Sequence, residues 1–288
     1  MSELLSTPDN NQVLAKAEID TMISTAKAYP RNEFEAISKA IQLATMDEET
    51  AQSCFYALPR KDKDNNKIEI KGASIRLAEI IMSVWGNIHA ATRIVEVAEK
   101  HITTAGVCWD LEKNVRIEMP DKVSIWFGEK GGRGGYRANN DMQVMLTKAS
   151  CSKALRNAIF RVIPKALVDR VYAKAVEAAI GDTKTIASKV RKVVDKLVKM
   201  GINQEEMLEY FGHSKLDDFT AEDLQSLMGI GTALKEKMIK PEEVFMIEKQ
   251  PQESAANTLN TMIASKQAPK IESSIDSETG EVVNPQPY

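Results

Sequence analysis

The spacing of apolar residues changes twice along the chain, and each change marks a new kind of element. Up to Gly86 apolar positions recur at helical intervals, with Asn32 and Asp47 placed to cap two helices and Gly86 placed to end the last one. The charged stretch between residues 59 and 72 is rich in turn formers, which fits a loop or a hairpin. The helices predicted here cover residues 12–29, 32–46, 47–58 and 73–84.

From residue 88 the chain is rich in Val, Ile, Thr and Trp, and its apolar positions alternate with polar ones. Val123, Ile125 and Phe127 occupy every second position, as expected of a strand with one buried face. The strands predicted by this pattern are antiparallel and cover residues 88–98, 101–111, 114–119 and 122–127.

Helical spacing returns after the strands and continues to residue 238. Asp141 is placed to cap a long helix that ends near Val162, because Pro164 cannot continue it. Asn203 and Glu206 have the spacing of a capping box. The helices predicted after Pro164 cover residues 166–180, 184–200, 203–211 and 220–238.

Together these elements predict an α+β fold, in which an antiparallel β-meander packs on a long basic helix. Helices precede this core, and a small all-helical module follows it. The polar segment after residue 248 has the composition of a disordered tail. The predicted parts are a disordered N-terminus at 1–11, an α+β core at 12–180, a helical module at 184–247 and a tail at 248–288.

Composition narrows the class of protein. Hydrophobic residues make up 43% of the chain and charged residues 27%, which is ordinary for a globular protein. No apolar run has the length of a membrane span, and the N-terminus lacks the pattern of a secretory signal. Three cysteines lie far apart and are typical of reduced thiols. These features predict a cytoplasmic protein.

Charge is distributed unevenly along the chain. The segment 122–174 holds six lysines and five arginines against three acids, a net of +8, whereas the whole chain has a net charge of −3. The remaining residues therefore carry a net of −11. This asymmetry favours an anionic partner for the basic segment, although a solvated basic face explains it as well.

Several enzyme classes lack their motifs. The glycine-rich stretch "FGEKGGRGGYRANND" contains no G-K-[ST], which a phosphate-binding nucleotide loop requires, and no G-x-S-x-G is present. His89, His101 and His213 are not spaced as metal ligands. The sequence thus predicts no catalytic residue, no metal and no cofactor. Asp110 and Glu112 leave one alternative open, since two carboxylates on one strand face can bind the magnesium of a nuclease.

The basic segment places its charges on a loop and on the helix that follows. Lys148, Ser152 and Arg156 form one line along this helix, whereas Lys153 and Arg161 are expected to point elsewhere. Apolar residues of the helix, from Met142 to Val162, are expected to pack on the sheet. Such a loop and helix bind phosphates, and nearby aromatic rings can stack on bases. The candidate nucleic-acid-binding residues are Trp126, Lys130, Arg133, Tyr136, Arg137, Lys148, Lys153, Arg156, Arg161 and Lys165.

The run "KASCSKALRNAIFRVIPKAL" after a β-meander resembles the phage single-strand-annealing recombination proteins of the Erf, RecT and Red-beta kind. "IKGASIRLAEIIMSVWGNI" and "VCWDLEKNV" resemble segments of phage proteins associated with that group. The resemblance covers roughly residues 50–180. It implies a β-β-β-α core that binds single-stranded DNA in a basic groove and assembles into rings or helical filaments. It also implies a phage or prophage protein that anneals complementary strands into duplex without hydrolysing nucleotides.

By the same resemblance, Lys148, Lys153, Arg156 and Arg161 would line or support the groove. The loop residues Lys130, Arg133 and Arg137 would clamp the strand. The C-terminal helices resemble a small domain that contacts a single-strand-binding protein or a phage exonuclease.

The stretch "LQSLMGIGTALKEKM" also fits a helix-hairpin-helix, in which the backbone amides from Gly229 to Gly231 would bind phosphate. It fits equally a tight turn that only packs two helices together. Three alternatives to annealing remain: a nucleic-acid-binding protein without annealing activity, a metal-dependent nuclease, and a phage regulatory or anti-defence protein.

Overall fold

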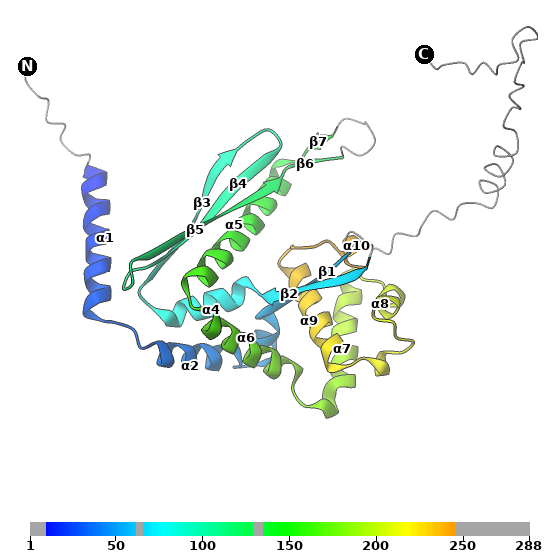
Figure 1. Ribbon diagram of the computed structural model, residues 1–288. Helices are drawn as coiled ribbons and strands as arrows, with labels where there is room; N and C mark the ends of the chain where they lie inside the picture. The colour runs from blue at the N-terminus through cyan, green and yellow to red at the C-terminus, as the bar shows by residue number, and fades with distance from the viewer. Residues whose placement is uncertain (1–9, 62–65, 129–134, 246–288) are drawn as a thin grey trace, which may run out of the picture. The chain divides into compact units, whose positions relative to one another are not determined.

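The computed structural model describes residues 10–61, 66–128 and 135–245, all within the first of two compact units, which spans Met1–Met246. Residues 1–9 of the N-terminal segment predicted to be disordered at 1–11 lie outside these ranges, as does the tail predicted at 248–288, whereas residues 10 and 11 belong to a helix. The fold is α+β, as the sequence predicts (Figure 1). The helices are α1 Asn10–Ala28, α2 Glu33–Ala44, α3 Glu48–Ser53, α4 Ile75–Trp85, α5 Asn140–Val162, α6 Lys165–Ile180, α7 Ile186–Lys199, α8 Gln204–Phe211, α9 Ala221–Lys235 and α10 Pro241–Val244, with short 3-10 turns at η2 Thr183–Thr185 and η3 Leu216–Asp218.

All strand pairs in this part of the chain are antiparallel and form three small sheets, ordered β1-β2, β3-β4-β5 and β6-β7. The strands are β1 Phe55–Lys61, β2 Lys67–Ala73, β3 Ile88–Val97, β4 His101–Asp110, β5 Val115–Ser124, β6 Trp126–Phe127 and β7 Tyr136–Arg137.

Two of the predicted boundaries are wrong. The helix expected over 47–58 ends at Ser53, and Phe55 begins β1, so the described residues of the charged stretch, 59–61 and 66–72, lie in or next to two paired strands. The strands expected at 114–119 and 122–127 are mostly one strand, because β5 continues through Pro120, which lies opposite Ala105. A proline is tolerated there because β5 is an edge strand, and its missing amide faces away from the ladder.

Helix α5 packs on one face of the β3-β4-β5 sheet (Figure 1). Its cap is Asn139, whose side chain accepts from the Met142 amide, rather than the expected Asp141, which lies in the first turn. A Cβ added to Gly106 on β4 would lie 2.3 Å from the backbone carbonyl carbon of Ala154, so helix and sheet approach closely here. Small residues therefore fix the position of α5, and the expected apolar Met145 is instead 44% exposed.

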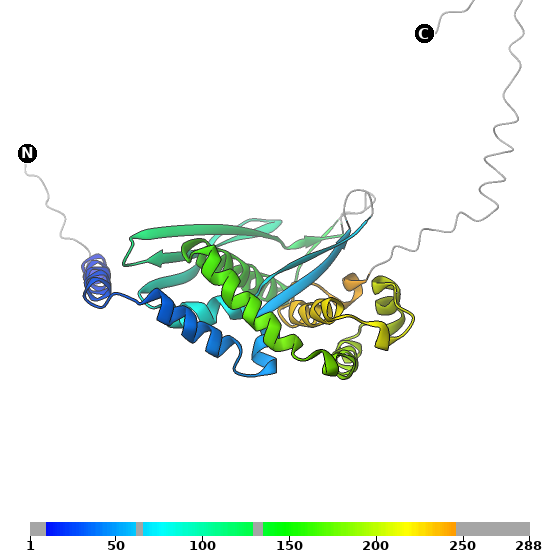
Figure 2. The ribbon, with the colours of Figure 1, turned by 60° about the horizontal axis from the view of Figure 1, so that its bottom comes forward.

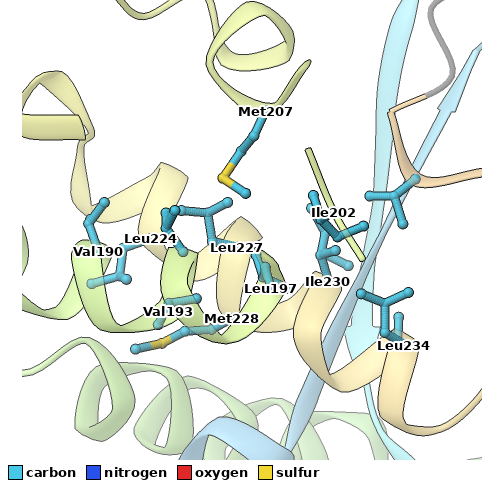
Figure 3. Close-up of a cluster of buried hydrophobic side chains, with 14 of the residues drawn as sticks. Val190, Val193, Leu197, Ile202, Met207, Leu224, Leu227, Met228, Ile230 and Leu234 are labelled. Carbon is cyan, nitrogen blue, oxygen red and sulfur yellow. The ribbon is translucent and has the colours of Figure 1, made fainter. Parts of the chain in front are cut away.

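A buried hydrophobic cluster joins the C-terminal helices to the β1-β2 hairpin (Figure 3). Leu197 of α7, Met207 of α8 and Leu227 of α9 belong to it, and so do Phe55 of β1 and Ala179 of α6. Helices α7 to α9 thus share their core with elements from residues 50–180. Most members of this cluster lie in the helical module expected at 184–247, and Phe55 of β1 and Ala179 of α6 extend the same core beyond it.

A second buried cluster lies among α2, α4, α6 and the C-terminal half of α5. In Figure 2 the three-stranded sheet lies above α2 and α6. Leu77 and Ile81 of α4 and Ile159 of α5 are fully buried in this cluster. The C-terminal half of α5 is therefore covered by helices, whereas Met142 and Leu146 of its N-terminal half belong to a separate small cluster with Ile102 and Ile125.

The helix-hairpin-helix interpretation is wrong. Gly229 and Gly231 lie inside the continuous helix α9, and both are buried. A Cβ on Gly229 would lie 2.7 Å from the Ala57 backbone nitrogen, whereas a Cβ on Gly231 would meet the side-chain ends of Leu197 and Gln52 at 3.7 and 3.9 Å, which is ordinary contact. The first glycine lets α9 approach β1 closely, and neither forms a phosphate-binding turn.

These two glycines give a matched pair of predictions. Gly231→Ala is expected to leave stability unchanged or raise it by up to about 1 kcal/mol, because alanine favours a helix. Gly229→Ala is expected to lower the free energy of unfolding by roughly 1–3 kcal/mol, because α9 must move away from β1. Urea unfolding of both variants measures the difference. Equal stabilities would show that α9 and β1 are not in close contact.

Candidate nucleic-acid interface

A groove of about 580 Å³ opens between the β1-β2 hairpin, the edge strand β5, helix α5 and the C-terminal end of α9. The N-terminal turn of α4 completes its wall. Among the charged residues that the described ranges contribute to the lining, eight are cations and two are carboxylates, a net of +6. The cations are Arg60, Arg76, Lys122, Lys148, Lys153, Arg156, Lys235 and Lys237, and the acids are Asp121 and Glu236.

Ion pairs within the groove neutralise only part of this charge. Lys153 Nζ lies 2.7 Å from Asp121 Oδ1, and Arg76 lies 2.7 Å from Glu79 on the same helix. Among the described residues, Arg60, Lys122 and Lys148 have no carboxylate within ion-pair distance. The groove therefore keeps a positive potential that favours an anionic ligand.

Arg156 is the most unusual of these cations because its side chain is nearly buried, with a residue exposure of 8%. Its guanidinium carbon lies 4.9 Å from the centre of the Tyr56 ring, and its Nε and Nη2 donate to Asn157 Oδ1 at 3.3 Å. No carboxylate of the described residues lies within ion-pair distance of it, although Glu236 is near enough to interact with it electrostatically. Burying an unpaired charge is costly. A phosphate in the groove would offset that cost and find the guanidinium already oriented.

The predicted line along α5 is confirmed in part. Lys148, Ser152 and Arg156 all contribute to the groove wall. The expectation that Lys153 points elsewhere is wrong, since Lys153 also lines the groove and is tied to β5 through Asp121. Asp121 Oδ2 accepts a second hydrogen bond, from Ser150 Oγ at 2.8 Å. The contacts of Asp121 with Lys153 and Ser150 fix α5 to the edge strand and orient the cations beside it.

Glu236 is the second acid in the groove, where it follows the last turn of α9. Burial raises the pKa of Glu236 above its ordinary value; nearby Arg76 and Arg156 oppose the rise, and Glu79 adds to it. Its Oε1 atom is buried and has no hydrogen-bond partner in the part of the chain described. A protonated Glu236 would leave the groove more positive than an ionised one.

We expect Glu236→Gln to tighten polyanion binding by about two- to tenfold at neutral pH and to flatten its pH dependence. Wild-type affinity should rise as the pH falls through the raised pKa of Glu236, because protonation removes the repulsion between Glu236 and phosphate. The glutamine side chain does not titrate, so the binding affinity of the variant should lack this pH dependence. Fluorescence anisotropy with a labelled oligonucleotide over a pH series measures both effects. Parallel pH profiles for the two proteins would contradict the prediction.

Other predicted site residues lie outside the groove. Arg161 is exposed in the last turn of α5, and Lys165 on α6 pairs with Asp169 at 2.6 Å. Arg137 is exposed on β7. Lys130 and Arg133 fall within residues 129–134, outside the described ranges, so the clamp expected from this loop stays a prediction.

The two predicted aromatic residues lie on the small β6-β7 sheet and do not line the groove. Trp126 is half-buried, and the Lys100 ammonium lies 5.1 Å from its ring centre. Tyr136 is 62% exposed and lies beside Phe127. Tyr136 thus has a free ring face that a base could contact, whereas Trp126 mainly packs within the sheet.

Sequence reasoning missed five of the eight groove cations. Arg60, Arg76, Lys235 and Lys237 lie outside the basic segment 122–174, and no local pattern distinguishes them from other surface cations. Lys122 belongs to that segment but was not selected as a site residue. Only the packing of the hairpin and α9 beside α5 brings these charges together.

The carboxylates considered for a nuclease are held by an arginine. Arg31 donates to Asp110 through Nη1 and Nη2 at 2.8 and 2.6 Å, and to Glu112 through Nε at 2.9 Å. The Arg31 and Asp110 side chains are only 4% and 3% exposed. In the described ranges, no group of three or more His, Cys, Asp or Glu residues is arranged to bind a metal ion. Asp110 and Glu112 thus have a structural role in joining β4 to the start of α2.

None of the described helices combines the length and the hydropathy that crossing a membrane requires. Comparison with protein-family models, with curated proteins and with solved structures found no match to this chain. The basic groove on α5, with the nearly buried Arg156 in its wall, is therefore the feature on which a function can be argued.

Proposed function

We propose that this protein binds single-stranded DNA in the groove beside α5 and anneals complementary strands without hydrolysing nucleotides. The observation that carries the binding proposal is Arg156, which is nearly buried without a carboxylate partner in a groove whose lining has a net charge of +6. Such a site is suited to phosphate, since an arginine held by packing loses little freedom when it binds.

The proposal of annealing rests on the resemblance to phage annealing proteins. Support for it comes from the β3-β4-β5 meander, which precedes α5 with the short β6 and β7 between them, an order similar to the β-β-β-α core that the resemblance implies. Assembly into rings or filaments, a phage origin and contacts with a single-strand-binding protein or an exonuclease belong to the same proposal. The annealing would use no nucleotide, which agrees with the missing G-K-[ST] motif.

The direct test is an annealing assay with two complementary oligonucleotides, without ATP and without added metal. The protein should accelerate duplex formation, measured by the quenching of a paired fluorophore. Binding without acceleration would support a nucleic-acid-binding protein that does not anneal. An absence of binding at low salt would contradict the whole proposal and favour a regulatory role.

The groove itself is tested by its salt dependence. Replacing both Lys148 and Arg156 with glutamine is expected to weaken binding to all sequences alike, because these residues contact phosphate and not bases. The slope of log affinity against log salt should fall by about 1.4, since each phosphate contact on a single strand contributes about 0.7. Titrations at several salt concentrations measure the slope.

A matched control replaces Arg161 and Lys165 with glutamine, since both are exposed and lie outside the groove. This variant removes the same charge from a neighbouring surface and should leave the slope nearly unchanged. An equal loss of slope in both variants would mean that binding depends on overall charge and not on the groove. Thermal unfolding of each variant shows whether Arg156→Gln has disturbed the packing on Tyr56.

The nuclease alternative has less support after the fold is known. Asp110 and Glu112, the carboxylates on which it rests, already accept hydrogen bonds from Arg31. A metal at this position would have to displace a nearly buried guanidinium. Metal-dependent cleavage that is lost in Asp110→Ala, with the fold intact, would restore this alternative.

A further inference from the structure

A second hollow, of about 550 Å³, lies on the other side of the Lys148–Ser152 line. Helix α4, strand β3 and helix α5 form its walls. It shares three lining residues with the basic groove: Ile75, Lys148 and Ser152. The two hollows are therefore neighbours along one surface path that crosses α5 at Lys148.

The chemistry of the two hollows differs. Eight cations line the groove beside apolar residues such as Leu58, Val123 and Met145, whereas the second hollow has fewer charges and is lined largely by Ile75, Ile94, Leu155, Cys151 and the methyl-bearing Thr92 and Thr147. Its charged residues are Glu79, Arg93 and Lys148. Arg93 is paired with Glu118, and Glu79 with Arg76. Ile94 is 56% exposed, although β3 presents it beside this hollow.

We propose that this hollow receives unpaired nucleobases of the strand whose phosphates bind the basic groove. A single strand has a charged backbone on one side and apolar base faces on the other, and the surface beside α5 presents a cationic groove next to an apolar hollow with hydroxyl groups. The Lys148 side chain, shared by both, would bind the phosphate at the crossing. This inference rests on the proposed binding of single-stranded DNA and adds a specificity: the site selects strands with unpaired bases.

The reactivity of one cysteine can report whether this hollow is occupied. Cys151 lines the second hollow and not the groove, and its side chain is partly exposed. Cys54 and Cys108 are fully buried, and burial raises the pKa of each thiol to about 12. An alkylating reagent at neutral pH should therefore modify Cys151 selectively in the folded protein, because reaction requires an accessible thiolate.

The experiment measures the alkylation rate of Cys151 in the full chain with four ligands: a single-stranded oligonucleotide, an abasic strand of equal length, the corresponding duplex and inorganic polyphosphate. The single strand should slow alkylation by roughly tenfold at ten times its Kd, because only the free protein would react. Abasic strand, duplex and polyphosphate should protect much less, even at concentrations where competition shows that they occupy the groove.

A variant provides a second readout. Ile94→Ser removes an exposed apolar contact without changing a groove cation, and it should weaken binding of the single strand several-fold while leaving the affinity for polyphosphate unchanged. Equal protection of Cys151 by all bound ligands, or no protection by a bound single strand, would overturn the base-binding role and leave the proposed function intact. Failure of both the single strand and polyphosphate to bind would instead overturn the proposed function.

Discussion

Arg31→Met is expected to lower the free energy of unfolding by about 3–5 kcal/mol, because it leaves the nearly buried carboxylate of Asp110 without its partner. Methionine has a similar length and keeps the packing on Trp85, whose ring centre lies 5.0 Å from the guanidinium carbon. The loss should therefore come from the carboxylates of Asp110 and Glu112 and not from a cavity. Urea unfolding at neutral pH measures it.

The pH dependence separates this effect from a packing defect. Burial on its own raises the pKa of Asp110 and of Glu112, but hydrogen bonds outweigh it, chiefly those from Arg31 to Asp110 and from Asn87 and Arg31 to Glu112, so both pKa values are lowered. Their stabilising contribution is complete above the unfolded values, at about pH 4, and is lost as the pH falls through the lowered folded values. Arg31→Met abolishes this contribution. The difference between wild type and variant should therefore shrink on acidification below about pH 4.

The matched control for Arg31 is Arg191→Met, which breaks the exposed ion pair between Arg191 and Asp217. An exposed pair contributes at most about 1 kcal/mol. If Arg31→Met lowers the free energy of unfolding no more than Arg191→Met does, the ion pairs of Arg31 do not behave as buried ones. A difference between wild type and Arg31→Met that persists unchanged in acid would assign the loss to packing.

The second large effect concerns binding. Reversing two groove charges, with Lys122→Glu and Lys148→Glu, changes the net charge of the lining from +6 to +2. Each replaced residue loses a charge-assisted contact and introduces repulsion, so affinity for single-stranded DNA should fall on the order of 100-fold or more. Both side chains are exposed, and we expect little change in stability. Fluorescence anisotropy at fixed salt measures the loss.

Lys192→Glu with Lys196→Glu is the matched control, because these exposed lysines of α7 lie away from the groove lining. The control changes the net charge of the chain by the same amount. Comparable losses in the two variants would show that the general field of the protein, and not the groove, attracts the strand. Annealing rates measured on the same samples should fall in parallel with affinity.

The sequence by itself determined most of the local structure. Helical spacing, the caps at Asn32 and Asp47, and Pro164 located α2, the start of α3 and the end of α5, because these signals act within a few residues. Alternation located β3 and β4. The line of Lys148, Ser152 and Arg156 also followed from helical geometry alone. The capping box expected at Asn203 is not formed; the box in this region is at Thr220 and Asp223.

Only the tertiary structure decided which residues meet across the groove. Arg60 of β1, Arg76 of α4 and Lys237, which follows α9, are all more than 70 residues from Lys148, and only the packing of these segments beside α5 brings them to it. The burial of Arg156 on Tyr56 and the pairing of Arg31 with Asp110 depend in the same way on long-range contacts. Local spacing carries no information about such contacts. The spacing of charges along a helix determines which residues share a face, but not which other element packs beside that face.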